Sequence, residues 1–156
     1  MTAKSFSLLL IASVAGPLLF AADRPDLNGS WQVDATKSDV HSHLPPGLTW
    51  DIQQTDDKIQ ITERVGDKNV SQLTCQTNGK DCVVKDAGHS AKASFYYNGP
   101  MLVELETMGD NVTKKRLRTA DDGTLTVEVM HINPSSKDEK IVLTKSAAQR
   151  PVVANR

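Results

Sequence analysis

Histidines are the first residues of this sequence that could carry chemistry. His41 and His43 stand two positions apart with Asp39 nearby, a spacing that suits metal ligation if the segment is extended. The segment runs directly into Pro45, Pro46 and Gly47, and no third strong ligand stands beside it in the sequence. We therefore interpret it as a loop and expect no metal site and no cofactor.

Carboxylates and nucleophiles are the next candidates. Glu104 and Glu106 alternate along one segment and could form a catalytic pair, but basic residues in the following segment explain them better as partners in ion pairs. No Ser or Cys has the strand, turn and helix context of a nucleophile elbow. We expect no catalytic residues and no enzymatic activity.

The two cysteines, Cys75 and Cys82, flank a segment that contains the strong turn dipeptide Asn78-Gly79. A hairpin at this position would bring the two thiols together. In an exported protein this arrangement predicts a disulfide, since the compartment is oxidising.

The elements that must position these residues are short strands. Alternation of apolar and polar residues with a period of two dominates the chain, and turn-forming clusters such as Asn98-Gly99 and Asp122-Gly123 separate the alternating segments. The predicted strands are Ser30–Asp34, Thr49–Gln53, Lys58–Arg64, Val70–Cys75, Cys82–Lys85, Ser90–Tyr97, Met101–Thr107, Val112–Thr119, Thr124–Ile132 and Lys140–Lys145. About ten strands with hairpin connections predict an all-β antiparallel meander, and a meander of this length avoids exposed edges by closing into a barrel or a sandwich.

The pattern of apolar residues also predicts a register for the strands around Leu117. With Gly109, Asp110 and Asn111 taken as the turn, Val103 and Leu105 share the inner face with Leu117. Glu104 and Glu106 then lie on the outer face, opposite Lys114 and Arg116. In the next hairpin Leu125, Val127 and Val129 join the inner face, and Glu128 stays outside with the basic residues.

The same alternation places Lys115 and His131 on the inner face, with Thr113 beside them in step. An inward lysine either reaches the mouth of the barrel or meets an anion, because burying an unpaired charge is costly. One interpretation is a lysine that extends to solvent; the other is a site for the carboxylate or phosphate of an amphiphilic ligand. Trp50 and Tyr96-Tyr97 could stack on a sugar or another flat ligand, or could serve as ordinary half-buried strand aromatics.

The segment before the first strand carries a resemblance to a known family. Gly29, Ser30 and Trp31, preceded by Asn28, resemble the G-x-W signature of lipocalin-like (calycin) barrels. The resemblance implies an up-and-down barrel of about 8–10 strands in which Trp31 closes one end, and often a hydrophobic ligand. The order of turns and strands over the rest of the chain also resembles small secreted bacterial proteins of unknown function.

The N-terminal segment predicts export. Lys4 precedes an almost uncharged apolar run, Phe6 to Phe20, that is too short to cross a bilayer comfortably, and small residues follow it. We therefore expect a cleaved signal peptide over residues 1–22, a barrel domain over 23–145 and a flexible tail over 146–156, in a secreted or periplasmic protein without stable membrane insertion.

Charge and composition exclude some partners. The 18 Lys and Arg residues nearly balance the 19 Asp and Glu residues, which argues against a dedicated nucleic-acid binder. The sequence thus predicts an exported, non-catalytic barrel that binds a small hydrophobic or amphiphilic molecule. The alternative is a protein-interaction module, such as a secreted inhibitor of a protease or lytic enzyme. An enclosed cavity of about 300 Å³ or more would favour the ligand, and a solid interior with an exposed apolar patch would favour the protein partner.

Overall fold

A computed structural model describes residues 24–41, 43–86 and 89–146 of the chain. Within these ranges it has ten strands and no helix: β1 (Gly29–Val33), β2 (Leu48–Gln54), β3 (Lys58–Val65), β4 (Lys68–Gln76), β5 (Asn78–Asp86), β6 (His89–Asn98), β7 (Met101–Met108), β8 (Asn111–Thr119), β9 (Leu125–Asn133) and β10 (Glu139–Lys145). This part of the chain accordingly offers no helix of the length and hydrophobicity that a membrane span needs. The predicted signal peptide, residues 1–22, and residues 147–156 of the predicted tail lie outside the described residues.

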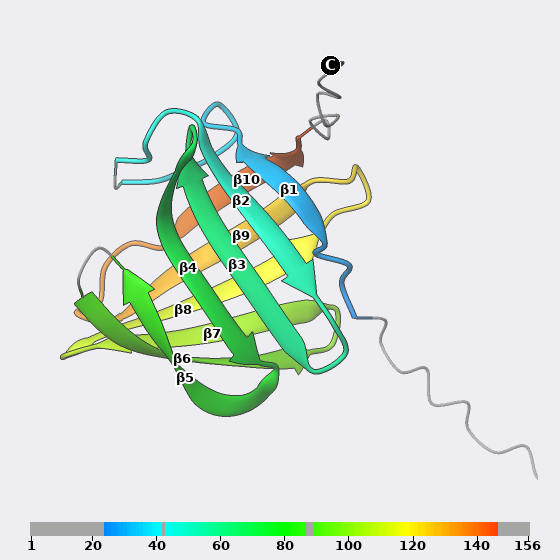
Figure 1. Cartoon of the computed structure of the whole chain (residues 1–156). Helices are drawn as coiled ribbons and strands as arrows, with labels where there is room; N and C mark the ends of the chain where they lie inside the picture. The colour runs from blue at the N-terminus through cyan, green and yellow to red at the C-terminus, as the bar shows by residue number, and fades with distance from the viewer. Residues whose placement is uncertain (1–23, 42, 87–88, 147–156) are drawn as a thin grey trace, which may run out of the picture.

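The ten strands close into a barrel. Each strand pairs with the next one along the chain in antiparallel orientation, and β1 also pairs with β10, where Trp31 lies opposite Lys145. In Figure 1, β1, β2 and β3 form the near wall of the barrel, and β8 and β9 run behind them. The predicted all-β, antiparallel, up-and-down barrel is confirmed.

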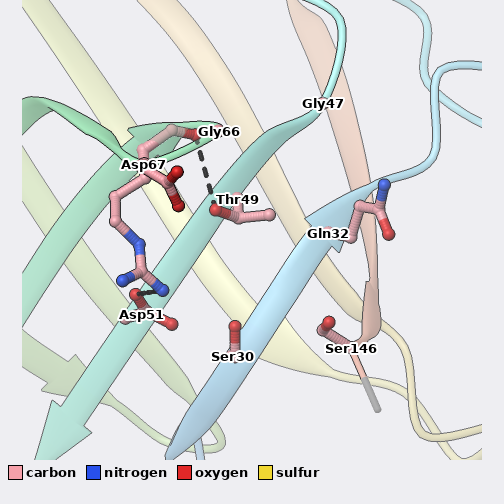
Figure 2. A pocket seen from close by; sticks show the side chains of 9 residues that line it. Ser30, Gln32, Gly47, Thr49, Asp51, Gly66, Asp67 and Ser146 are labelled. Carbon is pink, nitrogen blue, oxygen red and sulfur yellow. Dashed lines mark hydrogen bonds and ion pairs between the residues drawn. The ribbon is translucent and has the colours of Figure 1, made fainter. Parts of the chain in front are cut away.

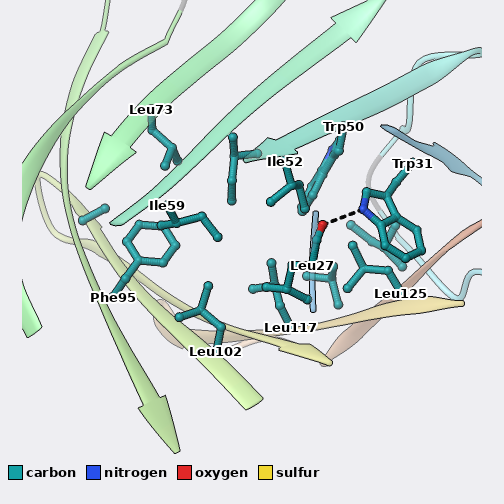
Figure 3. Close-up of a cluster of buried hydrophobic side chains, with 14 of the residues drawn as sticks. Leu27, Trp31, Trp50, Ile52, Ile59, Leu73, Phe95, Leu102, Leu117 and Leu125 are labelled. Atoms are coloured by element: carbon teal, nitrogen blue, oxygen red, sulfur yellow. Dashed lines mark hydrogen bonds between the residues drawn. The ribbon is translucent and has the colours of Figure 1, made fainter. Parts of the chain in front are cut away.

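One half of the barrel interior, the filled half, is a continuous apolar core. Its centre is formed by Leu27, Phe95, Leu102, Leu117 and Leu125, none of which is measurably exposed (Figure 3). These side chains come from different strands of the barrel and from the segment before β1, so they fill the space between its walls. Burial of this apolar surface is the main source of stability for the barrel.

Trp31 lies at the edge of this core and ties the N-terminal segment to it. Its indole Nε1 donates a hydrogen bond of 2.8 Å to the carbonyl oxygen of Leu27 (Figure 3). On the neighbouring strand, the side-chain amide of Gln54 donates to the carbonyl of Pro25 and accepts from the backbone N–H of Leu27. These bonds hold the apolar Leu27 inside the barrel end.

The predicted register between β7 and β8 is wrong. Glu104 lies opposite Lys115, and Leu102 lies opposite Leu117, so the even-numbered residues of β7 face inward. Val103 and Leu105 lie on the outer face opposite Arg116 and Lys114, although Val103 is well covered there.

The length of the turn is the reason for this difference. The connection between β7 and β8 has two residues, Gly109 and Asp110, because Asn111 already pairs with Met108. A two-residue connection and a three-residue connection place opposite faces of the next strand inward. A three-residue turn that includes Asn111 predicts Glu104 and Glu106 on the outer face, whereas the actual two-residue turn places them on the inner face.

The register between β8 and β9 is the predicted one. Leu117 lies opposite Val127 inside the barrel, and Arg116 lies opposite Glu128 outside it. Glu128 forms exposed ion pairs with Arg116 at 3.8 Å and with Arg118 at 3.3 Å. Exposed pairs of this kind contribute little to stability, about 0–1 kcal/mol each.

The predicted disulfide between Cys75 and Cys82 is present and joins β4 to β5. In these strands Ser71 pairs with Asp86, and Gln72 pairs with Lys85. The Cα atoms of the two cysteines are 5.6 Å apart, within the range for disulfides.

Candidate ligand-binding lumen

The other half of the barrel interior, the polar half, contains ionisable side chains. Glu63 on β3, Glu104 and Glu106 on β7, Lys115 on β8 and His131 on β9 occupy the inward positions of their strands. They continue the inward positions of strands whose other inward residues, such as Ile61, Leu102 and Val129, belong to the core, so the alternation that builds the core also brings these groups together.

Lys115 is the centre of this polar half. Its Nζ donates hydrogen bonds to Glu104 Oε1 at 3.2 Å and to Glu106 Oε2 at 2.9 Å. The side chain of Glu104 is only 2% exposed, whereas those of Lys115 and Glu106 are 22% and 27% exposed. One ammonium group thus bridges a deeply buried carboxylate and a second carboxylate closer to the mouth.

Burial and charge act in opposite directions on the three groups. For Glu104, burial dominates over the nearby ammonium and raises the pKa of the carboxyl. For Glu106, burial also favours the neutral form, but the charge of Lys115 and its hydrogen bond outweigh it and lower the pKa. Burial alone would lower the pKa of Lys115, yet Glu104 and Glu106 more than compensate and raise it. Lys115 and Glu106 therefore form a charged pair, and Glu104 is the more readily protonated of the two carboxyls.

Two cavities lie inside the barrel around this cluster. One has a volume of about 210 Å³ and extends between Trp50, Leu73, Val84 and Glu104. The other, about 270 Å³, extends toward the β9–β10 side between Leu48, Thr113, Val129 and His131. The two cavities share four lining residues: Trp50, Glu63, Glu106 and Lys115. The cavities therefore lie on either side of these side chains, and neither alone reaches the volume of about 300 Å³ that would favour a ligand.

Trp50 contributes a polar group to that common wall. The residue is 5% exposed, and its indole Nε1 has no hydrogen-bond partner among the described residues. Buried indole N–H groups usually find an acceptor, because leaving a buried donor unpaired costs free energy. This unsatisfied donor lies on a residue that lines both cavities.

Four of the five predicted ligand-binding residues lie together. Lys115, Thr113, His131 and Trp50 all line the 270 Å³ cavity. Tyr97 does not: its hydroxyl accepts a hydrogen bond from Gln54 Nε2 at 2.8 Å, and Arg24 lies 4.5 Å from its ring centroid.

The acidic residues of the lumen were not among the predicted site residues. Glu104 and Glu106, expected on the outer face, line it because of the two-residue β7–β8 turn. Glu63 follows Ile59 and Ile61 in step on β3, so the period-two pattern could have identified it as an inward residue.

A further hollow of about 400 Å³ lies on the outer face of β1, β2 and β3 (Figure 2). It is lined by polar side chains such as Ser30, Gln32 and Thr49, and the ion pair between Arg64 and Asp51 forms one wall. Thr49 Oγ1 donates to the carbonyl oxygen of Arg64 at 3.4 Å. These contacts join neighbouring strands on the outside of the barrel.

The segment that contains His41 and His43 lies against β10 through Asp39. Asp39 pairs with Lys140 through a β-bridge and forms an exposed ion pair with Lys137 at 3.6 Å. Among the described residues, His, Cys, Asp and Glu form no group of three that could hold a metal ion.

Comparison with known proteins concerns the fold. No family model and no curated protein sequence matches this chain. Solved structures do: a secretary abundant heat soluble (SAHS) protein from Ramazzottius varieornatus has a TM-score of 0.66 at 12% identity, covering 81% of this chain and 99% of that one. The REP1-NXSQ fatty acid transporter has a TM-score of 0.64 at 13% identity, covering 78% and 97%. Together with the closed ten-stranded meander, these similarities show that the chain has the fold of a lipocalin-like small β-barrel.

Proposed function

We propose that this protein is a non-catalytic binding protein that holds a small apolar or amphiphilic molecule in the polar half of its lumen. The observation that carries the proposal is the pair of cavities inside the barrel, which meet at Trp50, Glu63, Glu106 and Lys115. A concave, largely apolar space with a few convergent polar groups is the usual form of a small-molecule site.

The apolar part of the lining comes from both walls of the barrel. Leu73, Val84 and Ala91 line one cavity, and Leu48 and Val129 line the other. They offer a hydrocarbon chain apolar surface to pack against. One structural neighbour is itself named a fatty acid transporter, which supports a ligand with an apolar chain.

We also propose that the protein acts outside the cytoplasm. The disulfide between Cys75 and Cys82 supports an oxidising compartment, since disulfides rarely persist in the cytosol. The predicted signal peptide supports the same location. The alternative role as a secreted inhibitor stays a prediction.

The test is native mass spectrometry of the protein purified from its own host, followed by titration with hexanol as a neutral amphiphilic probe. Ala91→Leu places extra bulk in the 210 Å³ cavity, and we expect it to weaken hexanol binding by about tenfold or more. Ser90→Leu adds similar bulk at the neighbouring exposed position and should leave binding unchanged. Absence of both a co-purified molecule and hexanol binding would refute a ligand-binding lumen.

A further inference from the structure

We infer that the lumen takes only short-chain molecules, because a partition of side chains confines the ligand to one of the two cavities. The partition consists of the four side chains that line both cavities: Trp50, Glu63, Glu106 and Lys115. This inference depends on the proposed function and specifies the size of the ligand.

The partition is built from opposite walls of the barrel. Trp50 on β2 lies opposite Glu63 on β3, and Glu106 and Lys115 belong to the neighbouring strands β7 and β8. In the closed order of the strands, four strands separate β2 from β7, and four separate β3 from β8, in either direction around the barrel. The four inward side chains therefore enter the lumen from two opposite sides.

Hydrogen bonds hold the β7–β8 side of the partition in place. Lys115 Nζ donates to Glu106 at 2.9 Å and to Glu104 at 3.2 Å. The side chain of Glu104 is only 2% exposed, so a lysine that moved aside would leave a buried carboxyl without its partner, which is costly. From the opposite wall, Glu63 also raises the pKa of Lys115, so the two sides interact across the lumen. A ligand must therefore fit beside the partition, because displacing it costs stability.

The space on each side of the partition is small. The two cavities have volumes of about 210 Å³ and 270 Å³, whereas sites for drug-sized ligands have about 300–1,000 Å³. Each cavity has its own apolar lining, Leu73 and Val84 on one side and Leu48 and Val129 on the other. Either cavity can thus hold a short chain by itself, but a long chain would need both cavities and would have to cross the partition.

Isothermal titration calorimetry with straight-chain primary alcohols, from butanol to decanol, tests the inference. Each methylene group that a ligand buries strengthens binding by about fourfold. We expect the affinity of the wild type to rise by this factor with each methylene group until the chain fills one cavity, and to rise no further with longer chains. This length limit is measured on the wild type and requires no variant.

Three variants show whether the partition sets the limit. Glu106→Ala removes a carboxyl group and a methylene group, so the affinity should continue to rise for about two further methylene groups of the alcohol. Glu106→Gln removes the charge but keeps the size of the side chain, and should keep the wild-type limit. Glu128→Ala makes the same substitution as Glu106→Ala on the outer face of β9 and should also keep this limit. Thermal unfolding of each variant shows whether the fold is retained.

A wild-type affinity that rises at the same rate up to decanol would overturn the inference. The same length limit in the wild type and in Glu106→Ala would also overturn it, as would a limit in Glu106→Gln as long as that in Glu106→Ala. In each of these cases the alcohols bind, so the proposed function stands. No binding of any alcohol would overturn the proposed function together with the inference.

Discussion

At the scale of single residues, Lys115 neutralises two glutamates inside the barrel, and its loss should be costly. Lys115→Met keeps the length of the side chain but leaves Glu104 and Glu106 without the ammonium that they share. We expect the free energy of unfolding to fall by about 3 kcal/mol at neutral pH, because removing one partner of a buried ion pair strands the other charge. Urea denaturation followed by circular dichroism measures this change.

Lys114, the neighbouring residue, provides the control for this prediction. It lies on the outer face of β8 opposite Leu105, and Lys114→Met should change the free energy of unfolding by less than about 0.5 kcal/mol. The double variant of Lys115→Met with Glu104→Gln should recover part of the loss. Equal losses in the free energy of unfolding for Lys115→Met and Lys114→Met would show that the buried ion pairs of Lys115 contribute no more to stability than an exposed lysine does.

The two glutamates should give opposite dependences of stability on pH. The lowered pKa of Glu106 means that its ionised form stabilises the fold above its ordinary pKa of 4.5, and this contribution is lost as the pH falls through the lowered value. The raised pKa of Glu104 has the opposite sign: its ionised form costs stability, and protonation on acidification relieves that cost.

Comparison with glutamine variants over a range of pH separates the two effects. The stability advantage of the wild type over Glu106→Gln should shrink from neutral to acidic pH, whereas its stability relative to Glu104→Gln should improve. Unfolding free energies from urea titrations at each pH provide the measurement. If the unfolding free energies of both variants changed with pH in the same way, the opposite pKa shifts of Glu104 and Glu106 would be contradicted.

At the scale of elements, the two-residue turn between β7 and β8 determines which side chains face the lumen. Gly109 has a φ of +60° there, in the left-handed region that β-branched residues strongly disfavour. Gly109→Val should therefore lower the free energy of unfolding by about 1–3 kcal/mol. Gly109→Asn should cost clearly less, because asparagine tolerates this conformation better than valine. Thermal unfolding measures both variants. A loss of stability in Gly109→Val no larger than that in Gly109→Asn would contradict the requirement for a left-handed backbone conformation at this position.

The strands could be predicted from the sequence because each has its own period-two pattern and its own turn signal. All ten predicted strands are present, and so is the disulfide that the Asn78-Gly79 turn suggested. The β7–β8 register could not, because asparagine favours turns, whereas Asn111 already pairs with Met108 as the first residue of β8. A shift of the register by one residue moves every side chain of the strand to the other face, so Glu104 and Glu106 were predicted on the outer face and not in the site.

The candidate site was therefore predictable only in part. Lys115 and His131 could be placed inward from the β8–β9 register, which depends on the alternating Leu125, Val127 and Val129 of β9 opposite Leu117 on β8. The partners of Lys115 depend on the neighbouring hairpin, where apolar residues occur on both faces, Leu102 inside and Val103 outside. A pattern with apolar residues on both faces cannot specify a register by itself.

At the scale of the whole molecule, the barrel is asymmetric along its length: one half is filled and the other contains the cavities. Leu117 is fully buried in the filled half, where Leu117→Ala would open a new void, and we expect a loss of about 3–5 kcal/mol in the free energy of unfolding. Leu48 lines the 270 Å³ cavity, so Leu48→Ala enlarges a space that already exists and should cost about half as much. Hexanol affinity should respond in the reverse order, changing in Leu48→Ala and not in Leu117→Ala. Equal losses of stability together with equal effects on hexanol binding would mean that the two halves do not divide stability and binding between them.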